Sequence, residues 1–105
     1  MDSKLRKRHR IIERISFNTE IVINDSVVCK TLDISKGGLY VHTSHSFNPG
    51  DVIKVSLPFR NEKLEIKSRV KYCHEGVGIG LMFIDLDDTL KTKIKELIEE
   101  IKKSS

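Results

Sequence analysis

Apolar and polar residues alternate with a period of two along most of the chain, and this pattern predicts short β-strands. Alternating stretches cover residues 15–23, 27–35, 39–44, 53–59, 64–73 and 77–84. Turn signals separate them, among them an Asn-Asp-Ser sequence at 24–26 and an Asn-Pro-Gly-Asp sequence at 48–51. Pro58 cannot donate a backbone hydrogen bond, so the end of its strand is expected at a sheet edge or a bulge.

The period changes near the C-terminus, from about residue 87 to about residue 102. Apolar residues recur there at the spacing of one face of a helix, at Leu90, Ile94, Leu97, Ile98 and Ile101. An aspartate at 87 or 88 can cap the start of this helix, and two lysines at 102 and 103 suit its negative end. Short antiparallel strands followed by one helix predict a small closed barrel with the helix packed on it.

Alternation also assigns side chains to the two faces of each strand. In the stretch 27–35 it places Leu32 and Ile34 toward the core, with Asp33 and Ser35 side by side on the outer face at the strand end. In the stretch 64–73, Tyr72 falls in the apolar set and is expected in the core.

Composition limits the class of protein. The chain has 105 residues, of which 38% are hydrophobic and 32% charged, as expected for one globular domain with one modest core. No apolar run is long enough to insert into a membrane, and the N-terminus lacks the apolar segment of a signal peptide, so a cytoplasmic location is expected. Cys29 and Cys73 have no paired spacing, so we expect reduced thiols and no metal site.

Charge is concentrated at the N-terminus. The net charge of +4 favours an anionic partner, and residues 1–9 are too charged to pack. We therefore expect a flexible basic arm at 1–9, followed by a barrel domain at 10–105. The arm is either a solubilising tail or a segment that orders over a phosphate-bearing ligand. Without paired acids, a catalytic triad or a P-loop, the sequence gives no indication of an enzyme.

Two short motifs carry the candidate chemistry. Arg10-x-x-x-Arg14 supplies two guanidinium groups suited to phosphate, and Asp33-x-Ser35-x-x-Gly38 ends a strand with an acid, a hydroxyl and a turn glycine. In this order, with one strand and a hairpin between them, the motifs resemble those of the PilZ domain, the bacterial receptor module for cyclic di-GMP. Residues 77–86 and the helix after them are similar to the last strand of that family and its exit.

The resemblance implies a six-stranded antiparallel β-barrel with a C-terminal helix, and cyclic di-GMP as the ligand. It implies that Arg10 and Arg14 fork onto phosphate oxygens or guanine O6 and N7, and that Asp33 accepts from guanine N1 and N2. Ser35 would bond a phosphate or a base edge, and Gly38 would keep the turn open. Secondary ligand contacts are expected from Arg6, Arg8, His9, Lys36 and Gly37.

Two points stay open at this stage. Arg6-x-x-x-Arg10 is a second possible frame for the arginine motif, although Arg14 leads directly into the first strand, as the second arginine of the family does. The family often doubles the first arginine, whereas here His9 precedes it and Ile11 follows it. The number of bound ligands, one or a stacked pair, is therefore undecided.

The function implied is a receptor and adaptor. Ligand binding would order the arm, and an unidentified downstream protein would read the change in motility, pilus, biofilm or exopolysaccharide control. Some family members stack a base on an aromatic ring of a neighbouring strand, and Tyr72 is the candidate for that role. The alternatives are a PilZ-like protein adaptor without ligand binding and a small nucleic-acid-binding barrel. The second is disfavoured because the sequence has no aromatic stripe.

Overall fold

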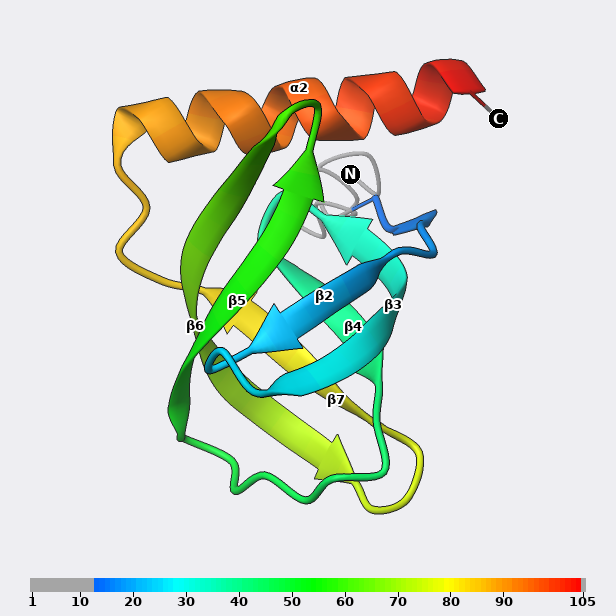
Figure 1. The fold of residues 1–105 in the computed structure, drawn as a ribbon, viewed down its shortest axis with the longest axis vertical. Helices are drawn as coiled ribbons and strands as arrows, with labels where there is room; N and C mark the ends of the chain where they lie inside the picture. Colours follow the sequence, from blue (N-terminus) through cyan, green and yellow to red (C-terminus); the bar gives the residue numbers. More distant parts are fainter. Residues whose placement is uncertain (1–12, 105) are drawn as a thin grey trace, which may run out of the picture.

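The computed structural model describes residues 13–104, which form an antiparallel barrel with one long helix across its end (Figure 1). The expected basic arm at 1–9 lies outside these residues. The elements are β1 (Ile15–Ser16), β2 (Glu20–Ile23), β3 (Val27–Ser35), β4 (Gly38–His42), β5 (Val52–Phe59), β6 (Glu62–His74), β7 (Gly78–Phe83) and α2 (Asp88–Ser104).

Strands β1 and β2 are two parts of one interrupted strand, because both pair with β3. The hydroxyl of Thr31 fills the interruption: it donates to the carbonyl of Phe17 and accepts from the amide of Thr19 at 3.0 Å. Counted in this way, the ring runs β2–β5–β6–β7–β4–β3 and closes through the pairing of β3 with β2. The predicted six-stranded antiparallel barrel with a C-terminal helix is confirmed.

The seam between β2 and β5 is the shortest in the ring. Only two residue pairs join these strands, Val22 with Ser56 and Ile23 with Val55. Asn24 extends the seam: its amide donates to the carbonyl of Lys54, and its side-chain oxygen accepts from the amide of Lys54, both at 2.9 Å. Beyond this seam β5 pairs with β6 alone, and Pro58 lies in that part, as expected.

Alternation of buried side chains along each strand fills the barrel with aliphatic residues, including Ile21, Ile34, Val55, Ile66 and Leu81. Helix α2 covers one end of the barrel with the face predicted from its spacing, which buries Ile94, Leu97 and Ile98. Asp87 caps the helix, since its carboxylate accepts the amide of Leu90 at 2.8 Å. Within residues 13–104 no helix is long and apolar enough to cross a membrane.

Ion pairs connect the turn of the β5–β6 hairpin to α2, and Figure 1 shows that this turn reaches the helix. Arg60 donates to Glu100 through Nε at 2.8 Å and to Glu96 through Nη1 at 3.2 Å, and Lys93 pairs with Glu62 at 2.6 Å. These side chains are roughly half exposed, so each pair adds little to stability. Together they pair charges on this face of the helix with charges on the hairpin turn.

The expected faces of β3 are wrong at its end. A β-bulge between Thr31 and Asp33 inserts Leu32 as an extra residue, so Leu32 faces outward and is 42% exposed. Ile34 is buried as expected, but Ser35 is also buried, at 2% exposure, because the chain turns there. Asp33 and Ser35 are therefore not side by side on an exposed face.

A second bulge corrects the expectation for Tyr72. The pairing of β6 with β7 shifts between Val70 and Tyr72, so Lys71 is the extra residue. Tyr72 consequently leaves the core and is 41% exposed on the outer face of the barrel. Both bulges lie near the outer surface around Asp33, and they determine which side chains meet there.

Candidate functional site

A row of paired residues crosses the outer face of the barrel and positions the candidate site. Asp33 on β3 pairs with Ser16 on one side and with Tyr40 of β4 on the other. Tyr40 pairs with Gly80 of β7, which in turn pairs with Tyr72 of β6. The register therefore brings an acid and two tyrosines onto one continuous surface, although they come from three distant parts of the chain.

Arg14 is attached to this row by an ion pair. Its Nε and Nη2 atoms both lie 2.8 Å from Oδ1 of Asp33. The two side chains are 44% and 33% exposed, so the pair stands at the surface and can exchange partners. Two of the predicted site residues thus meet, one from the segment before β1 and the other from β3.

The turn at residues 35–38 forms one wall of the site. The hydroxyl of Ser35 accepts the amide of Gly37 at 3.2 Å, and the carbonyl of Gly37 accepts the amide of Phe83 at 2.8 Å. A Cβ on Gly38 would lie 1.9 Å from the carbonyl oxygen of Leu81, so only glycine fits between β4 and β7. The same side chain that was expected to contact a ligand, Ser35, therefore also stabilises the turn.

Two tyrosine rings cover glycines of β7 next to this wall. A Cβ on Gly80 would lie 2.3 Å from the Tyr72 ring, and a Cβ on Gly78 would lie 2.9 Å from the Tyr40 hydroxyl. The ring centroids of Tyr40 and Tyr72 are 6.2 Å apart, and that of His74 is 5.0 Å from Tyr72. Burial, with a smaller contribution from Tyr72, raises the pKa of Tyr40 above its ordinary value.

These elements enclose a pocket of about 170 Å³, which we call the ligand pocket. Its wall combines a guanidinium group, an ammonium group, an aromatic ring and bare turn backbone, from Arg14, Lys71, Tyr72, Ser35, Gly37 and Gly38. Residues 80–82 of β7 complete it. A cation next to a half-exposed ring and backbone suits a planar base joined to a phosphate.

The structure brings together four of the predicted residues as pocket lining: Arg14, Ser35, Gly37 and Gly38. Asp33 contributes by holding Arg14. Lys36 lines a different pocket, on the helix side of the turn. The remaining predicted residues, Arg6, Arg8, His9 and Arg10, lie outside the described residues, so both arginine frames remain predictions.

Sequence reasoning missed Lys71 and Met82 as lining residues and assigned Tyr72 to the core. Each depends on the bulge in β6, which moves Lys71 and Tyr72 relative to β7. No local pattern marks that bulge, because residues 64–73 alternate regularly. The sequence alone offers one indication of this surface, namely Tyr72 together with Gly78 and Gly80 of β7, which lie beneath the tyrosine rings.

The two cysteines and Glu13 do not add to the site. Cys29 is buried, and this burial raises the pKa of its thiol, while Cys73 is partly buried and both are free thiols. Among the described residues no cluster of three or more histidines, cysteines or acids could hold a metal ion. Glu13, next to Arg14, pairs with Lys102 of α2 at 2.7 Å.

Solved structures with this fold include three that carry a PilZ or cyclic di-GMP description. The PilZ domain of CeSA from a cellulose-synthesizing bacterium matches with a TM-score of 0.69 and 18% identity, covering 86% of this chain and 98% of that one. YcgR of Escherichia coli in complex with c-di-GMP matches with a TM-score of 0.72 and 13% identity, covering 90% of this chain and 46% of that one. PlzA of Borreliella burgdorferi, also in complex with c-di-GMP, matches with a TM-score of 0.62 and 22% identity, covering 90% and 43%.

The TM-scores establish a shared fold, and the chain spans less than half the length of YcgR and of PlzA. No curated protein matches the chain. The family model described as PilZ domain matches residues 4–100, which is nearly the whole sequence and includes both motifs. The chain therefore belongs to the PilZ domain family.

Proposed function

We propose that this chain is a receptor for cyclic di-GMP, in which the Arg14–Asp33 ion pair at the ligand pocket is the recognition element. PilZ domains are non-catalytic receptors for this ligand, in agreement with the expectation from sequence that the chain is not an enzyme. The observation that carries the proposal is the meeting of one residue from each motif, at 2.8 Å, beside the pocket.

Ligand binding would exchange this ion pair for contacts with the nucleotide. Arg14 would turn its guanidinium to a phosphate or to guanine O6 and N7, and Asp33 would accept from guanine N1 and N2. Each partner then keeps a charge-assisted hydrogen bond. Adenine offers no matching donor pair to Asp33, so the exchange favours guanine. Arg10 and the basic arm before it would add contacts to the second phosphate.

Tyr72 would supply the stacking surface for one base. Its ring is 41% exposed, lines the pocket and lies against Gly80, so it presents one flat side to solvent. Base stacking on an aromatic ring contributes about 1–3 kcal/mol. This assignment replaces the earlier expectation of a core tyrosine and gives the pocket an aromatic wall.

The output would pass through another protein. We propose a cytoplasmic adaptor, in which the ligand orders the basic arm over the pocket and a partner recognises the new surface. Control of motility, pili, biofilm or exopolysaccharide synthesis is consistent with the family, and identification of the partner decides among them.

Isothermal titration with cyclic di-GMP tests the proposal, with GTP and linear di-GMP as competing controls. We expect the cyclic ligand alone to bind, at a molar ratio near one or near two, which also decides between a single ligand and a stacked pair. Arg14→Ala and Asp33→Ala should each weaken binding by about 2–5 kcal/mol, because each leaves a charged group without its partner. Circular dichroism should show an unchanged barrel, since the exposed pair adds only about 0–1 kcal/mol to folding.

Arg60→Ala is the matched control, because Arg60 also forms an exposed ion pair but lies outside the ligand pocket. This variant should bind cyclic di-GMP as the parent protein does. Unchanged affinity in both Arg14→Ala and Asp33→Ala would contradict the site. If the parent protein does not bind cyclic di-GMP, the receptor proposal is contradicted, and the alternative of a protein adaptor that binds no ligand is favoured.

A further inference from the structure

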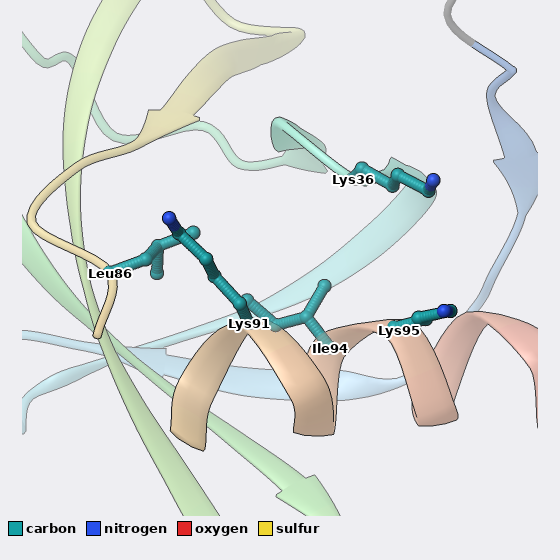
Figure 2. Close-up of a pocket in the computed structure, with 5 residues that line it drawn as sticks. All are labelled: Lys36, Leu86, Lys91, Ile94 and Lys95. Carbon is teal, nitrogen blue, oxygen red and sulfur yellow. The ribbon is translucent and has the colours of Figure 1, made fainter. Parts of the chain in front are cut away.

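A second pocket, of about 310 Å³, lies on the other side of the 35–38 turn, and we call it the lysine pocket. Leu86, before α2, and Ile94, on α2, form its apolar floor. Lys36 of the turn and Lys91 and Lys95 of the helix surround this floor. Figure 2 shows Ile94 pointing from the helix into the space, with Leu86 on one side and Lys36 above.

The three lysines of this pocket lack the ion pairs that other charged residues of the helix form with the barrel. Lys93 pairs with Glu62 at 2.6 Å, and Glu96 pairs with Arg60 at 3.2 Å. Within residues 13–104, by contrast, no ion pair to an acid involves Lys36, Lys91 or Lys95, and these exposed lysines line one pocket with partly exposed Leu86 and buried Ile94. Charges on one side of α2 are therefore paired with the barrel, while three positive charges without such pairs line the pocket on the other side.

This arrangement restricts what can bind. The volume is at the lower end of the range of about 300–1,000 Å³ for small-molecule sites, so it suits one or two apolar side chains. Three ammonium groups around that floor suit carboxylates that flank those side chains. We infer that the lysine pocket is the docking surface for an acidic segment of a partner protein that inserts a large apolar side chain between its acids.

The docking surface adjoins the ligand pocket through a single turn. Lys36 lines the lysine pocket, whereas its neighbours Ser35 and Gly37 line the ligand pocket. A ligand that moves the turn changes the position of Lys36 and with it the charge offered to the partner. This coupling rests on the proposed function, but the docking surface itself does not.

Defined peptides test the docking surface. The probes are fluorescent acidic nonapeptides of Asp and Glu that carry two leucines, spaced two, three or four positions apart. The controls replace both leucines with serine, or replace all acids with lysine. Fluorescence anisotropy with the full chain should show binding of at least one acidic leucine peptide, and weaker binding of both controls. No binding of any of the three acidic leucine peptides would overturn the proposal.

Matched variants locate the binding. Lys91→Gln/Lys95→Gln removes two pocket lysines, and Lys30→Gln/Lys103→Gln removes two exposed lysines elsewhere, so both lower the net charge from +4 to +2. Glutamine keeps the helix propensity of lysine. The pocket variant should bind the peptide at least about fivefold more weakly than the parent protein, whereas the control variant should bind it with nearly the affinity of the parent protein. Equal loss in both variants would show unspecific attraction and overturn the proposal.

Two further measurements separate this proposal from its competitors. Binding of the parent protein to phosphatidylglycerol vesicles, lost in the pocket variant while no peptide binds, would assign the lysines to a membrane surface instead. A chain that binds the peptide but not cyclic di-GMP would overturn the proposed function and leave the docking surface standing. The reverse result would overturn the docking surface alone.

Discussion

The two pockets on either side of the 35–38 turn differ in whether their positively charged side chains form ion pairs. In the ligand pocket, Arg14 is held at 2.8 Å by Asp33, an acid from the same surface. In the lysine pocket, by contrast, Lys36, Lys91 and Lys95 form no ion pair within residues 13–104, and they are exposed beside apolar residues. The two sites share only the 35–38 turn: strands β6 and β7 complete the ligand pocket, and Leu86 and α2 complete the lysine pocket.

This difference separates selectivity from attraction. A molecule that enters the ligand pocket must replace the ion pair on both sides, so it needs an anionic group and a donor group at a fixed separation. A molecule that enters the lysine pocket needs only acids and an apolar side chain, because no internal bond has to break. We therefore expect a strict preference for one nucleotide on one side of the turn, and a broad preference for acidic peptides on the other.

The largest effect on both pockets is expected from a substitution in the 35–38 turn that lies between them. Gly38→Ala places a Cβ 1.9 Å from the Leu81 carbonyl oxygen, and that backbone atom cannot move without separating β4 from β7. We expect a loss of more than about 3 kcal/mol in the free energy of unfolding, measured by urea denaturation.

Gly37→Ala is the control for this variant, because a Cβ at Gly37 meets no atom within 4 Å. It should fold with nearly the stability of the parent protein and keep both pockets. Equal stability of the two variants would mean that β4 and β7 do not approach as closely at Gly38 as described here.

Thr31→Val acts on the ligand pocket through the strand that positions it. The substitution removes the hydroxyl that bonds Phe17 and Thr19, so two backbone groups at the interruption lose their partner. We expect a loss of about 1–3 kcal/mol in unfolding free energy and weaker binding of cyclic di-GMP, because Arg14 directly precedes β1. Thr43→Val, which also removes a buried hydroxyl, should leave nucleotide affinity unchanged; equal weakening by both would contradict the role of β1.

Tyr72 offers a way to sharpen the comparison without unfolding the barrel. Tyr72→Leu should weaken cyclic di-GMP by about 5–30-fold in titration, which corresponds to about 1–2 kcal/mol of stacking, and should leave the acidic peptide affinity unchanged. Tyr72→Phe keeps the ring and should bind nearly as well as the parent protein. Loss of affinity in the phenylalanine variant as well would assign the effect to the phenol group.

Ser35→Ala is expected to have the smallest effect. The Ser35 hydroxyl accepts one bond from the Gly37 amide, and its proton can still be donated to a ligand. Removing it should lower the unfolding free energy and the affinity for cyclic di-GMP by about 0.5–1.5 kcal/mol each. A change in stability without any change in affinity would restrict Ser35 to a role in the turn.

Periodicity predicted the elements well because it reflects local geometry. The period of two along the strands and the spacing of Ile94, Leu97 and Ile98 were sufficient to predict a barrel and a helix. Asp87 was predicted as one of two candidate caps from its place before the apolar face, and it accepts the amide of Leu90. These features depend on neighbours a few residues apart, so the sequence displays them directly.

The bulges could not be predicted in this way, and they account for the errors at the site. Whether Leu32 or Lys71 is an extra residue depends on the register of β4 and β7, which pair with these strands from elsewhere in the chain. The lysine pocket has the same origin, because Lys36 and Lys91 are brought together only when α2 packs on the barrel. Arg14 and Asp33 are 19 positions apart, so local periodicity does not connect them. They were predicted to act together only through the resemblance to the family motifs.

The two-pair seam between β2 and β5 makes the strength of the barrel uneven. Opening at this seam breaks far fewer backbone hydrogen bonds than opening between β5 and β6, which pair over eight positions. Amide protons of β2 should therefore exchange with deuterated solvent faster, through local fluctuations, while those of the β5–β6 ladder should exchange only through global unfolding. Because Arg14 directly precedes β1 and β1 continues into β2, a nucleotide that binds this arginine would slow exchange at the seam, at a distance from its own contacts.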